Sequence, residues 1–302
     1  PDKKQFIQAA KDEVKSHVDN KHFTLFERCN LSKATKVLAS VWSMKQKRSI
    51  LTREVYKWKA RLNAHGGQQE HDVNFWETYS PVVNWFTIRL VQVISILSNW
   101  HTRQIDFVLA FPQADVECDI YMEVPPGFNI KGRKKEFCLK LKKNIYGTKQ
   151  GGPVWNRHLD KGLKKLGYVP SKIDPCLYFH GTATLMLYVD DGIFAGPSKT
   201  KIDGLIAGLK QEFNSIDEGD LKEYLGVLVE KLSNGTIKLS QAHLIAQVLS
   251  DLWFNDKTNV KQTPAPGGKI LKRKMGAKGM AEDFHYRSVI GIIFWKNLQG
   301  QI

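Results

Sequence analysis

LYVDDGIFAG, residues 187–196, sets two adjacent carboxylates between two apolar runs. The runs, 185–189 and 192–195, are rich in the β-branched, aromatic and aliphatic residues found in strands, whereas aspartate fits poorly inside a strand. Asp190 and Asp191 are therefore predicted to form the tip of a tight hairpin. Adjacent carboxylates repel one another, and a divalent cation would remove that cost. The plain alternative is a solvated turn.

A third carboxylate is expected from a distant part of the chain. Asp106 lies in a short strand predicted over 103–107, just before the aromatic residues Phe107 and Phe111. Carboxylate oxygens on adjoining strands suit magnesium, which takes one or two protein carboxylates together with phosphate oxygens. Two metal ions on shared carboxylates indicate phosphoryl transfer. A rival acidic cluster is interpreted as a solvated face: Asp115, Glu117 and Asp119.

The charge of the chain points to a polyanionic partner. Among 302 residues, 45 Lys and Arg stand against 30 Asp and Glu, a formal charge of +15. With 42% hydrophobic residues the chain is globular rather than a disordered basic tail, and its length suggests two or three subdomains. No apolar run approaches the ~18 residues that cross a bilayer, so no membrane partner is expected. One cluster of cations lies on predicted strands between 36 and 62: Lys45, Lys47, Arg48, Arg53, Lys57, Lys59 and Arg61.

Apolar periodicity predicts the remaining elements. A strand is expected over 120–124, and a hairpin joins 224–232 to 236–241 through Ser233, Asn234 and Gly235. The helix expected over 82–100 has apolar residues around most of its circumference, which predicts that it is buried. Further helices are expected over 1–20, 153–166, 199–213 and 241–252.

Several further motifs occur in a fixed order along the chain: KWKARLNAHGG (57–67), FWETYSPVVNWFTIRL (75–90), HTRQIDFVLAFPQADVECDIYMEVPPGF (101–128), LKLKKNIYGTKQGGPVW (139–155), SKIDPCLYF (171–179), YLGVLVE (224–230) and LSQ (239–241). Together with LYVDDGIFAG they cover most of 36–265. The series resembles the reverse transcriptases of copia-type LTR retrotransposons. An ordered series of this kind is far more specific than any one of its motifs.

The resemblance implies an α+β fold of the right-hand polymerase type, with fingers, palm and thumb and an antiparallel palm sheet packed on helices. It implies the following division: an N-terminal helical lead-in at 1–35, the first part of the fingers at 36–84, the first part of the palm at 85–117, the second part of the fingers at 118–150, the second part of the palm with the YVDD hairpin and primer grip at 151–240, and the thumb with a truncated connection at 241–302.

The resemblance also implies roles for individual residues. Asp106, Asp190 and Asp191 would be catalytic and would hold two Mg²⁺ ions, for which Mn²⁺ could substitute. The backbone carbonyl of Phe107 would be a further metal contact, and Phe111 would exclude the ribose 2′-OH as a steric gate. The remaining substrate-binding positions are Gln150 against the incoming sugar, Lys59 and Arg61 on the triphosphate, and Tyr188 of the YVDD motif.

The implied function is RNA-directed DNA polymerase, extending a primer 3′-OH with dNTPs by two-metal phosphoryl transfer. Its partners would be an RNA or DNA template with primer, dNTPs, and the integrase and ribonuclease H segments of a full polyprotein, with oligomerisation left open. Its expected location is a cytoplasmic virus-like particle, with nuclear entry open.

Two alternatives remain at this point. A catalytically inactive nucleic-acid-binding remnant is favoured by the ragged ends of the chain and by Pro153, where arginine is usual in the family, and is disfavoured by the intact aspartate trio. Thr148 is a further departure, since leucine or glutamine is usual there. A metal-dependent nuclease would use the same carboxylates but needs a base for an attacking water. His101 precedes Asp106, yet a lone histidine beside a strand is usually structural.

Overall fold

The computed structural model describes residues 2–48, 54–128, 133–224, 227–232, 235–251 and 291. The chain divides into two compact units, Pro1–Leu221 and Lys222–Ile302. This boundary falls inside the 151–240 range expected for the second part of the palm, and the predicted subdomain limits remain predictions. Of the 241–302 range expected for the thumb and truncated connection, all but 241–251 and residue 291 lies outside the described residues.

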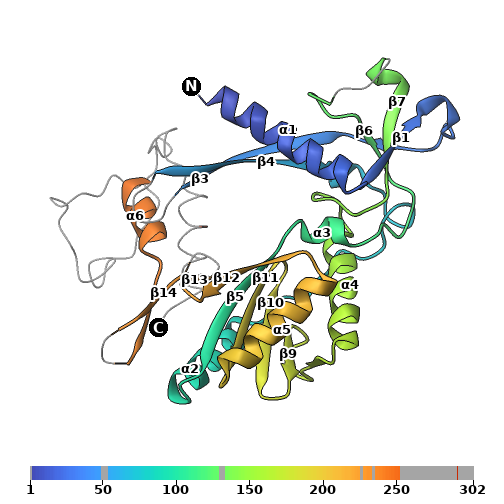
Figure 1. Ribbon diagram of the computed structural model, residues 1–302. Helices are drawn as coiled ribbons and strands as arrows, with labels where there is room; N and C mark the ends of the chain where they lie inside the picture. Colours follow the sequence, from blue (N-terminus) through green and yellow to red (C-terminus); the bar gives the residue numbers. More distant parts are fainter. Residues whose placement is uncertain are drawn as a thin grey trace, which may run out of the picture. The chain divides into compact units, whose positions relative to one another are not determined.

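A six-stranded sheet forms the centre of the first unit (Figure 1). Its strand order is β12-β5-β11-β10-β9-β8, and every neighbouring pair is antiparallel. The predicted α+β class with an antiparallel sheet is therefore confirmed. The strands are β5 (His101–Phe107), β8 (Val169–Pro170), β9 (Leu177–His180), β10 (Ala183–Tyr188), β11 (Asp191–Gly196) and β12 (Ser215–Asp220).

Helices pack on this sheet and complete its core. Both α2 (Trp85–Leu97) and α5 (Lys199–Glu212) contact β11, and α3 (Ala110–Gln113) contacts α4 (Gly151–Lys165). The core is apolar because alternate strand residues and one stripe of each helix point inward. Fully buried members include Ile105, Leu185, Phe194, Ile202 and Leu209.

The helix predicted over 82–100 is present as α2, but the prediction that it is buried was wrong. Ile88 and Val91 face the core, whereas Phe86 is 72% exposed and Leu97 is 81% exposed. Asn84 caps the helix, since its side-chain Oδ1 accepts a hydrogen bond from the Phe86 N–H. An apolar sequence establishes that a helix is suited to burial, but the number of packing partners decides how much of it is covered.

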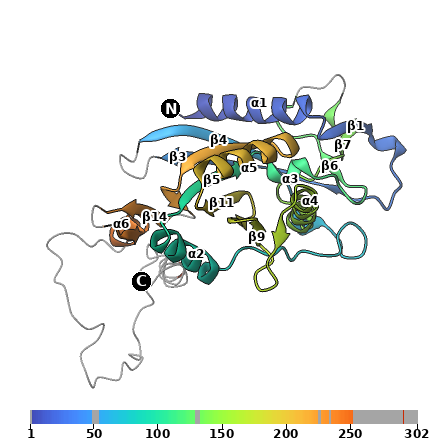
Figure 2. The ribbon, with the colours of Figure 1, turned by 60° about the horizontal axis from the view of Figure 1, so that its bottom comes forward.

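A second, mixed sheet has the order β1-β7-β6-β2, with β2 and β6 parallel. Its strands are β1 (Phe23–Glu27), β2 (Val37–Leu38), β6 (Tyr121–Glu123) and β7 (Phe137–Leu141). A separate two-stranded ribbon is formed by β3 (Ser40–Arg48) and β4 (Val55–Ala64), and α1 (Lys3–Asp19) lies along it in both views (Figures 1 and 2). Short 3-10 turns occupy Arg28–Asn30, Gly66–Gln68 and Lys134–Glu136.

Gly147 fastens the base of the ribbon to the segment that precedes α4. Its φ is +87°, and a Cβ at this position would lie 2.2 Å from the carbonyl oxygen of Ala64. The N–H of Ala64 in turn donates to the carbonyl oxygen of Tyr146 at 2.9 Å. Only glycine allows this backbone approach without strain, so Gly147 fixes where Tyr146 and Gln150 lie relative to β4.

The helix predicted from about Pro153 is present as α4, and it begins two residues earlier, at Gly151. Pro153 is buried in its first turn. The first four N–H groups of a helix have no partner inside it, so the missing N–H of proline is tolerated there. The departure from the family pattern at this position therefore leaves the helix intact.

The second unit holds β13 (Glu223–Tyr224), β14 (Val227–Lys231), β15 (Ile237–Ser240) and α6 (Ala242–Asp251). Strands β14 and β15 pair antiparallel, which confirms the predicted hairpin; Ser233 and Asn234 of its turn lie outside the described residues. No helix in the described part of the chain is both long and apolar enough to cross a membrane.

A buried histidine pair attaches α1 to the rest of its unit. The Nδ1 atoms of His17 and His22 are 2.9 Å apart, and the Glu13 carboxylate accepts a hydrogen bond from the Leu62 N–H at 3.2 Å. Burial, and secondarily the neighbouring His17, lower the pKa of His22 from 6.5 to about 4. His22 is thus neutral in the folded protein at pH 7.

We expect His22 to make the protein sensitive to acid. Because the pKa of His22 is lowered on folding, its contribution is present above pH 6.5 and is lost as the pH falls through about 4. The free energy of unfolding should drop by at most about 3 kcal/mol across this window through His22 alone. Urea unfolding of wild type and His22→Asn at pH 7 and pH 4.5 should show a smaller drop in the variant. Exposed His65→Asn is the matched control, and equal pH dependence in all three proteins would contradict the assignment.

Candidate active site

The backbones of the three predicted aspartates lie next to one another at one end of the six-stranded sheet. Strands β5 and β11 pair antiparallel with Asp106 directly opposite Asp191, and Asp190 lies in the turn that precedes β11. Tyr188 pairs with Asp191, so the two-residue turn consists of Val189 and Asp190. The prediction that Asp190 and Asp191 form the tip needs this correction: Asp191 is the first residue of β11. The shift aligns its backbone with that of Asp106.

Buried aromatic residues hold the turn of Val189 and Asp190 in place. Val189 adopts a left-handed conformation with φ of 57°, which is costly for a β-branched residue. Its carbonyl oxygen accepts a hydrogen bond from Trp155 Nε1 at 2.7 Å, and the Asp190 carbonyl accepts one from the Phe107 N–H at 2.8 Å. Phe107 and Trp155 are both buried and meet edge to face, with ring centroids 5.4 Å apart. The hydrophobic core thus holds the strained backbone in place.

The negative charge of each carboxylate makes ionisation of the neighbouring carboxylates less favourable. Burial, and then the charge of Asp190, raise the pKa of Asp106. Burial, followed by the charges of Asp190 and Asp106, raises the pKa of Asp191 to about 7. Ionisation is disfavoured by low dielectric and like charge, and both effects are relieved by a bound cation. The chemistry of this donor set therefore fits a divalent metal ion.

The side chains of this donor set do not form a complete metal site by themselves. Within the described ranges, no three acidic, histidine or cysteine side chains converge as a ready metal-binding group. Phosphate oxygens and water normally complete such a site for magnesium.

The rival acidic cluster is neutralised by cations: Asp115 by Lys143 at 2.8 Å, Glu117 by Arg157 at 2.7 Å and Asp119 by Lys140 at 2.8 Å. These pairs agree with its interpretation as a surface.

Cations of the ribbon act on the carboxylates. Lys59 and Arg61 are two residues apart on β4 and share one face, opposite the face on which Ala60 and Leu62 are buried. Lys59, Lys47 and Arg61 each counteract the rise in the pKa of Asp106. Burial, then Arg61 and Lys47, lower the pKa of Lys59 itself. The two predicted phosphate-binding cations are thus electrostatically coupled to Asp106.

Arg61 belongs to a stack that sequence reasoning missed. Its guanidinium carbon lies 3.7 Å from the centre of the Tyr146 ring, and the Tyr146 ring stacks on Phe111 with centroids 4.8 Å apart and planes at 23°. Phe111 lies at the start of α3, beside Gly151, where a Cβ would come within 2.8 Å of the Phe111 ring. Tyr146 therefore connects two predicted substrate-binding residues, Arg61 and Phe111. It lies in the motif LKLKKNIYGTKQGGPVW (139–155), but no role was predicted for it from the sequence.

Gln150 is buried directly before α4. Its Oε1 accepts a hydrogen bond from Gln69 Nε2 at 2.8 Å, while Gln69 Oε1 accepts one from the Lys149 N–H at 2.7 Å. Its own Nε2 has no hydrogen-bond partner within the described residues. A buried donor without a partner is costly, so Gln150 Nε2 is an unsatisfied polar group beside the first turn of α4.

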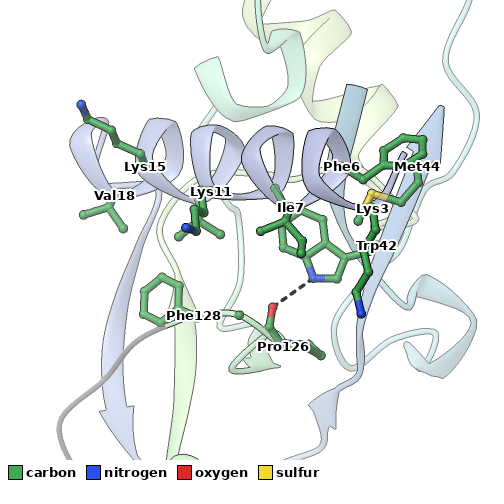
Figure 3. Close-up of a pocket in the computed structure, with 13 residues that line it drawn as sticks. Lys3, Phe6, Ile7, Lys11, Lys15, Val18, Trp42, Met44, Pro126 and Phe128 are labelled. Carbon is green, nitrogen blue, oxygen red and sulfur yellow. Dashed lines mark hydrogen bonds between the residues drawn. The ribbon is translucent and has the colours of Figure 1, made fainter. Parts of the chain in front are cut away.

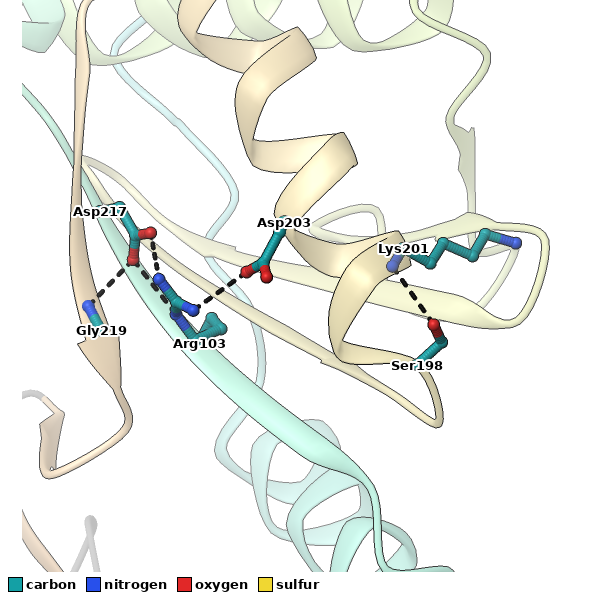
Figure 4. A network of polar contacts seen from close by, with 6 residues as sticks. All are labelled: Arg103, Ser198, Lys201, Asp203, Asp217 and Gly219. Atoms are coloured by element: carbon teal, nitrogen blue, oxygen red, sulfur yellow. Dashed lines mark hydrogen bonds and ion pairs between the residues drawn. The ribbon is translucent and has the colours of Figure 1, made fainter.

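An ion-pair network fixes the strand that carries Asp106 (Figure 4). Arg103 of β5 reaches Asp217 of β12 and, at 3.0 Å, Asp203 of α5. In the same helix, the Lys201 N–H donates to the Ser198 side chain, which caps α5. Arg103 is three residues before Asp106, and the network ties this strand to its neighbour β12 and to α5, which packs on the sheet.

We expect Trp155→Phe to reduce nucleotide incorporation about tenfold, because phenylalanine keeps an aromatic ring in the core but removes the hydrogen bond to Val189. The nucleotide KM should stay nearly unchanged, since only the placement of the aspartate turn is affected. Single-turnover primer extension measures both quantities. Trp58→Phe, on the ribbon, is the control. A wild-type rate in Trp155→Phe would show that the hydrogen bond does not position the turn.

Residues 20–266 match the protein family described as Reverse transcriptase (RNA-dependent DNA polymerase). The chain belongs to this family. Membership confirms the predicted right-hand polymerase class.

The curated relatives of this reverse transcriptase region are transposon proteins. It is 33% identical to the "Retrovirus-related Pol polyprotein from transposon TNT 1-94" of Nicotiana tabacum, over 98% of this chain and 23% of that protein. It is 32% identical to the "Retrovirus-related Pol polyprotein from transposon RE1" of Arabidopsis thaliana, over 78% of this chain and 16% of that protein. These names confirm the copia-type resemblance. The chain spans less than a quarter of either relative.

Solved structures are more distant. The "Structure of the foamy viral protease-reverse transcriptase dRH in complex with ds DNA" aligns with a TM-score of 0.42 and 10% identity, covering 95% of this chain and 40% of that one. An apo telomerase from Candida tropicalis aligns with a TM-score of 0.40 and 9% identity, covering 77% of this chain and 59% of that one.

Proposed function

We propose that this chain is the catalytic region of an RNA-directed DNA polymerase that extends a primer 3′-OH with dNTPs. The observation that carries the proposal is the pairing of Asp106 with Asp191, next to Asp190 and within reach of the charge of Lys59. Residues from distant stretches of the chain thus bring negative and positive charge close together, an arrangement that would suit metal ions and the phosphates of a nucleotide. Family membership supports the reaction class.

Three aspartates would hold the metal ions: Asp106, Asp190 and Asp191. Bound Mg²⁺, or Mn²⁺ in its place, would lower the pKa of the primer hydroxyl and neutralise charge on the phosphates. Between metal-binding events the carboxylates hold protons more readily than ordinary aspartates, because the pKa values of Asp106 and Asp191 are raised.

The remaining predicted residues would bind and select the nucleotide. Arg61, held over the Tyr146 ring, would present its guanidinium to the triphosphate together with Lys59. Phe111 would exclude a 2′-OH by the bulk of its ring. Gln150, whose Nε2 has no hydrogen-bond partner among the described residues, would lie against the incoming sugar. Tyr188 closes the aspartate turn through its pairing with Asp191.

The basic surplus of the chain supports binding of template and primer through phosphates. A duplex containing RNA would be recognised by its shape and 2′-OH groups, with little preference for base sequence. Integrase and ribonuclease H segments are further proposed partners, because the relatives are Pol polyproteins several times longer than this chain.

Primer extension on poly(rA)/oligo(dT) tests the proposal. Purified chain should add dTTP in Mg²⁺ or Mn²⁺, and an excess of EDTA should stop the addition. Binding of template and primer without extension would instead establish the inactive-remnant alternative. Shortening of a labelled duplex in the absence of dNTPs would favour the nuclease.

A further inference from the structure

An apolar groove of about 890 Å³ runs along α1 in the first unit, far along the chain from the aspartates (Figure 3). One wall is the flank of α1 that carries Ile7 and Val14, and the floor is Trp42 and Met44 of β3. Phe128, in the loop after β6, closes one end. The size is within the range of ligand-binding clefts.

The groove exists because α1 covers only half of the ribbon. The helix packs against β4, where Phe6 meets Trp58 edge to face at 4.8 Å and Leu62 is fully buried. The β3 half of the same face has no such cover, and Met44 is 43% exposed. Ile7, on the groove side of α1, is 47% exposed. Together these exposed side chains form a continuous apolar strip beside a helix.

The mouth of the groove is positively charged. Lys3, Lys11 and Lys15 are among the lining residues, and none of the lining residues is acidic. In Figure 3, the side chains of Lys3 and Lys11 lie on the groove side of α1, whereas the amine of Lys15 points away. Lys3 and Lys11 are eight residues apart, which is about 12 Å along a helix.

The side chains of Trp42 and Met44, which form the floor, leave no free hydrogen-bonding group for a ligand. The Trp42 indole N–H already donates to the Pro126 carbonyl oxygen at 3.3 Å. Base edges or sugar hydroxyls in the groove would therefore lose hydrogen bonds to water without replacement. Apolar side chains fit it, with carboxylates at the rim.

We propose that this groove docks a partner protein through an amphipathic acidic helix. The partner helix would lie beside α1 on the open half of the ribbon, with leucine-like side chains on Trp42 and Met44. Two carboxylates about 12 Å apart on its flank would pair with Lys3 and Lys11. This interaction is separate from polymerisation and does not depend on the proposed function.

The full chain and a labelled synthetic peptide test the proposal. The probe is an amphipathic helix of about 15 residues with leucines on one face and two glutamates eight residues apart on its flank. A matched peptide carries lysine at both positions. Fluorescence polarisation should show saturable binding of the acidic peptide, about tenfold tighter than its lysine counterpart at low salt. Equal affinity of the two peptides, or no saturable binding of the acidic one, would overturn the proposal.

Variants locate the binding site. Ile7→Glu and Met44→Glu change exposed positions and should each weaken the acidic peptide about tenfold, while the double variant Lys3→Glu/Lys11→Glu should reverse the charge preference. Leu90→Glu on α2, where the side chain is 46% exposed, is the control and should bind as wild type does. Circular dichroism verifies that each variant is folded. Wild-type affinity in Met44→Glu, or a self-association that Met44→Glu abolishes without effect on peptide binding, would reject the helix-docking site.

Discussion

Asp190→Asn should lower nucleotide incorporation roughly a thousandfold while leaving template and primer affinity unchanged or increased. Asparagine has nearly the same shape as aspartate, so the two-residue turn with Val189 should persist. The substitution removes one negative charge from the metal ligands and reduces repulsion toward nucleic acid. Single-turnover primer extension measures the rate, and a mobility-shift titration in EDTA measures affinity.

The same substitution has an electrostatic consequence. The charge of Asp190 is the second-largest cause of the raised pKa of Asp191, so in Asp190→Asn this pKa should fall from about 7 toward that of an ordinary aspartate. Asp115→Asn is the matched control, because Asp115 is paired with Lys143 on the surface. Extension by Asp190→Asn at the wild-type rate would remove the metal-binding assignment.

Phe111→Val should raise the incorporation of ribonucleotides relative to deoxynucleotides about a hundredfold. The expected cause is the removal of ring bulk that a 2′-OH would meet, and not the loss of a hydrogen bond. The Phe111 ring is held in place by its stack on Tyr146, so it should not move aside for a 2′-OH. The ratio of kcat/KM for UTP and dTTP on poly(rA)/oligo(dT) measures the effect.

A second aromatic pair supplies the control for this experiment. Phe26 packs against Tyr121, with ring centroids 5.4 Å apart, in the sheet that contains β1 and β6. Phe26→Val should change stability without changing the ratio. If Phe111→Val lowers incorporation of both nucleotides equally, Phe111 is a core aromatic residue and not a gate.

Sequence predicts most strongly where the pattern is local. The two apolar runs on either side of the carboxylates in 185–195 predicted the β10–β11 hairpin, and the helices α1, α4, α5 and α6 follow apolar periodicity. The meeting of Asp106 with this hairpin was predicted from ligand chemistry and from the family resemblance, and the strand register brings the residues together. Their catalytic roles remain predictions.

Contacts between distant residues were not predictable in the same way. Trp155 and Val189 are 34 residues apart, and nothing in either local sequence indicates an indole hydrogen bond to a strained carbonyl. The Arg61, Tyr146 and Phe111 stack likewise joins three separate segments. For α2, composition gave the helix but not its exposure, because burial depends on how many neighbours the tertiary fold provides.

Under the proposed function, the attraction between Lys59 and Asp106 would distinguish one form of the nucleotide from another. In the free protein Lys59 offsets part of the negative potential at Asp106. If a triphosphate attracts Lys59, the negative potential at Asp106 is no longer offset. A cation bound to the triphosphate would offset it instead. A metal-loaded nucleotide carries such a cation, whereas the bare polyanion does not. The protein would therefore sort nucleotides by their counterion before sorting them by base or sugar.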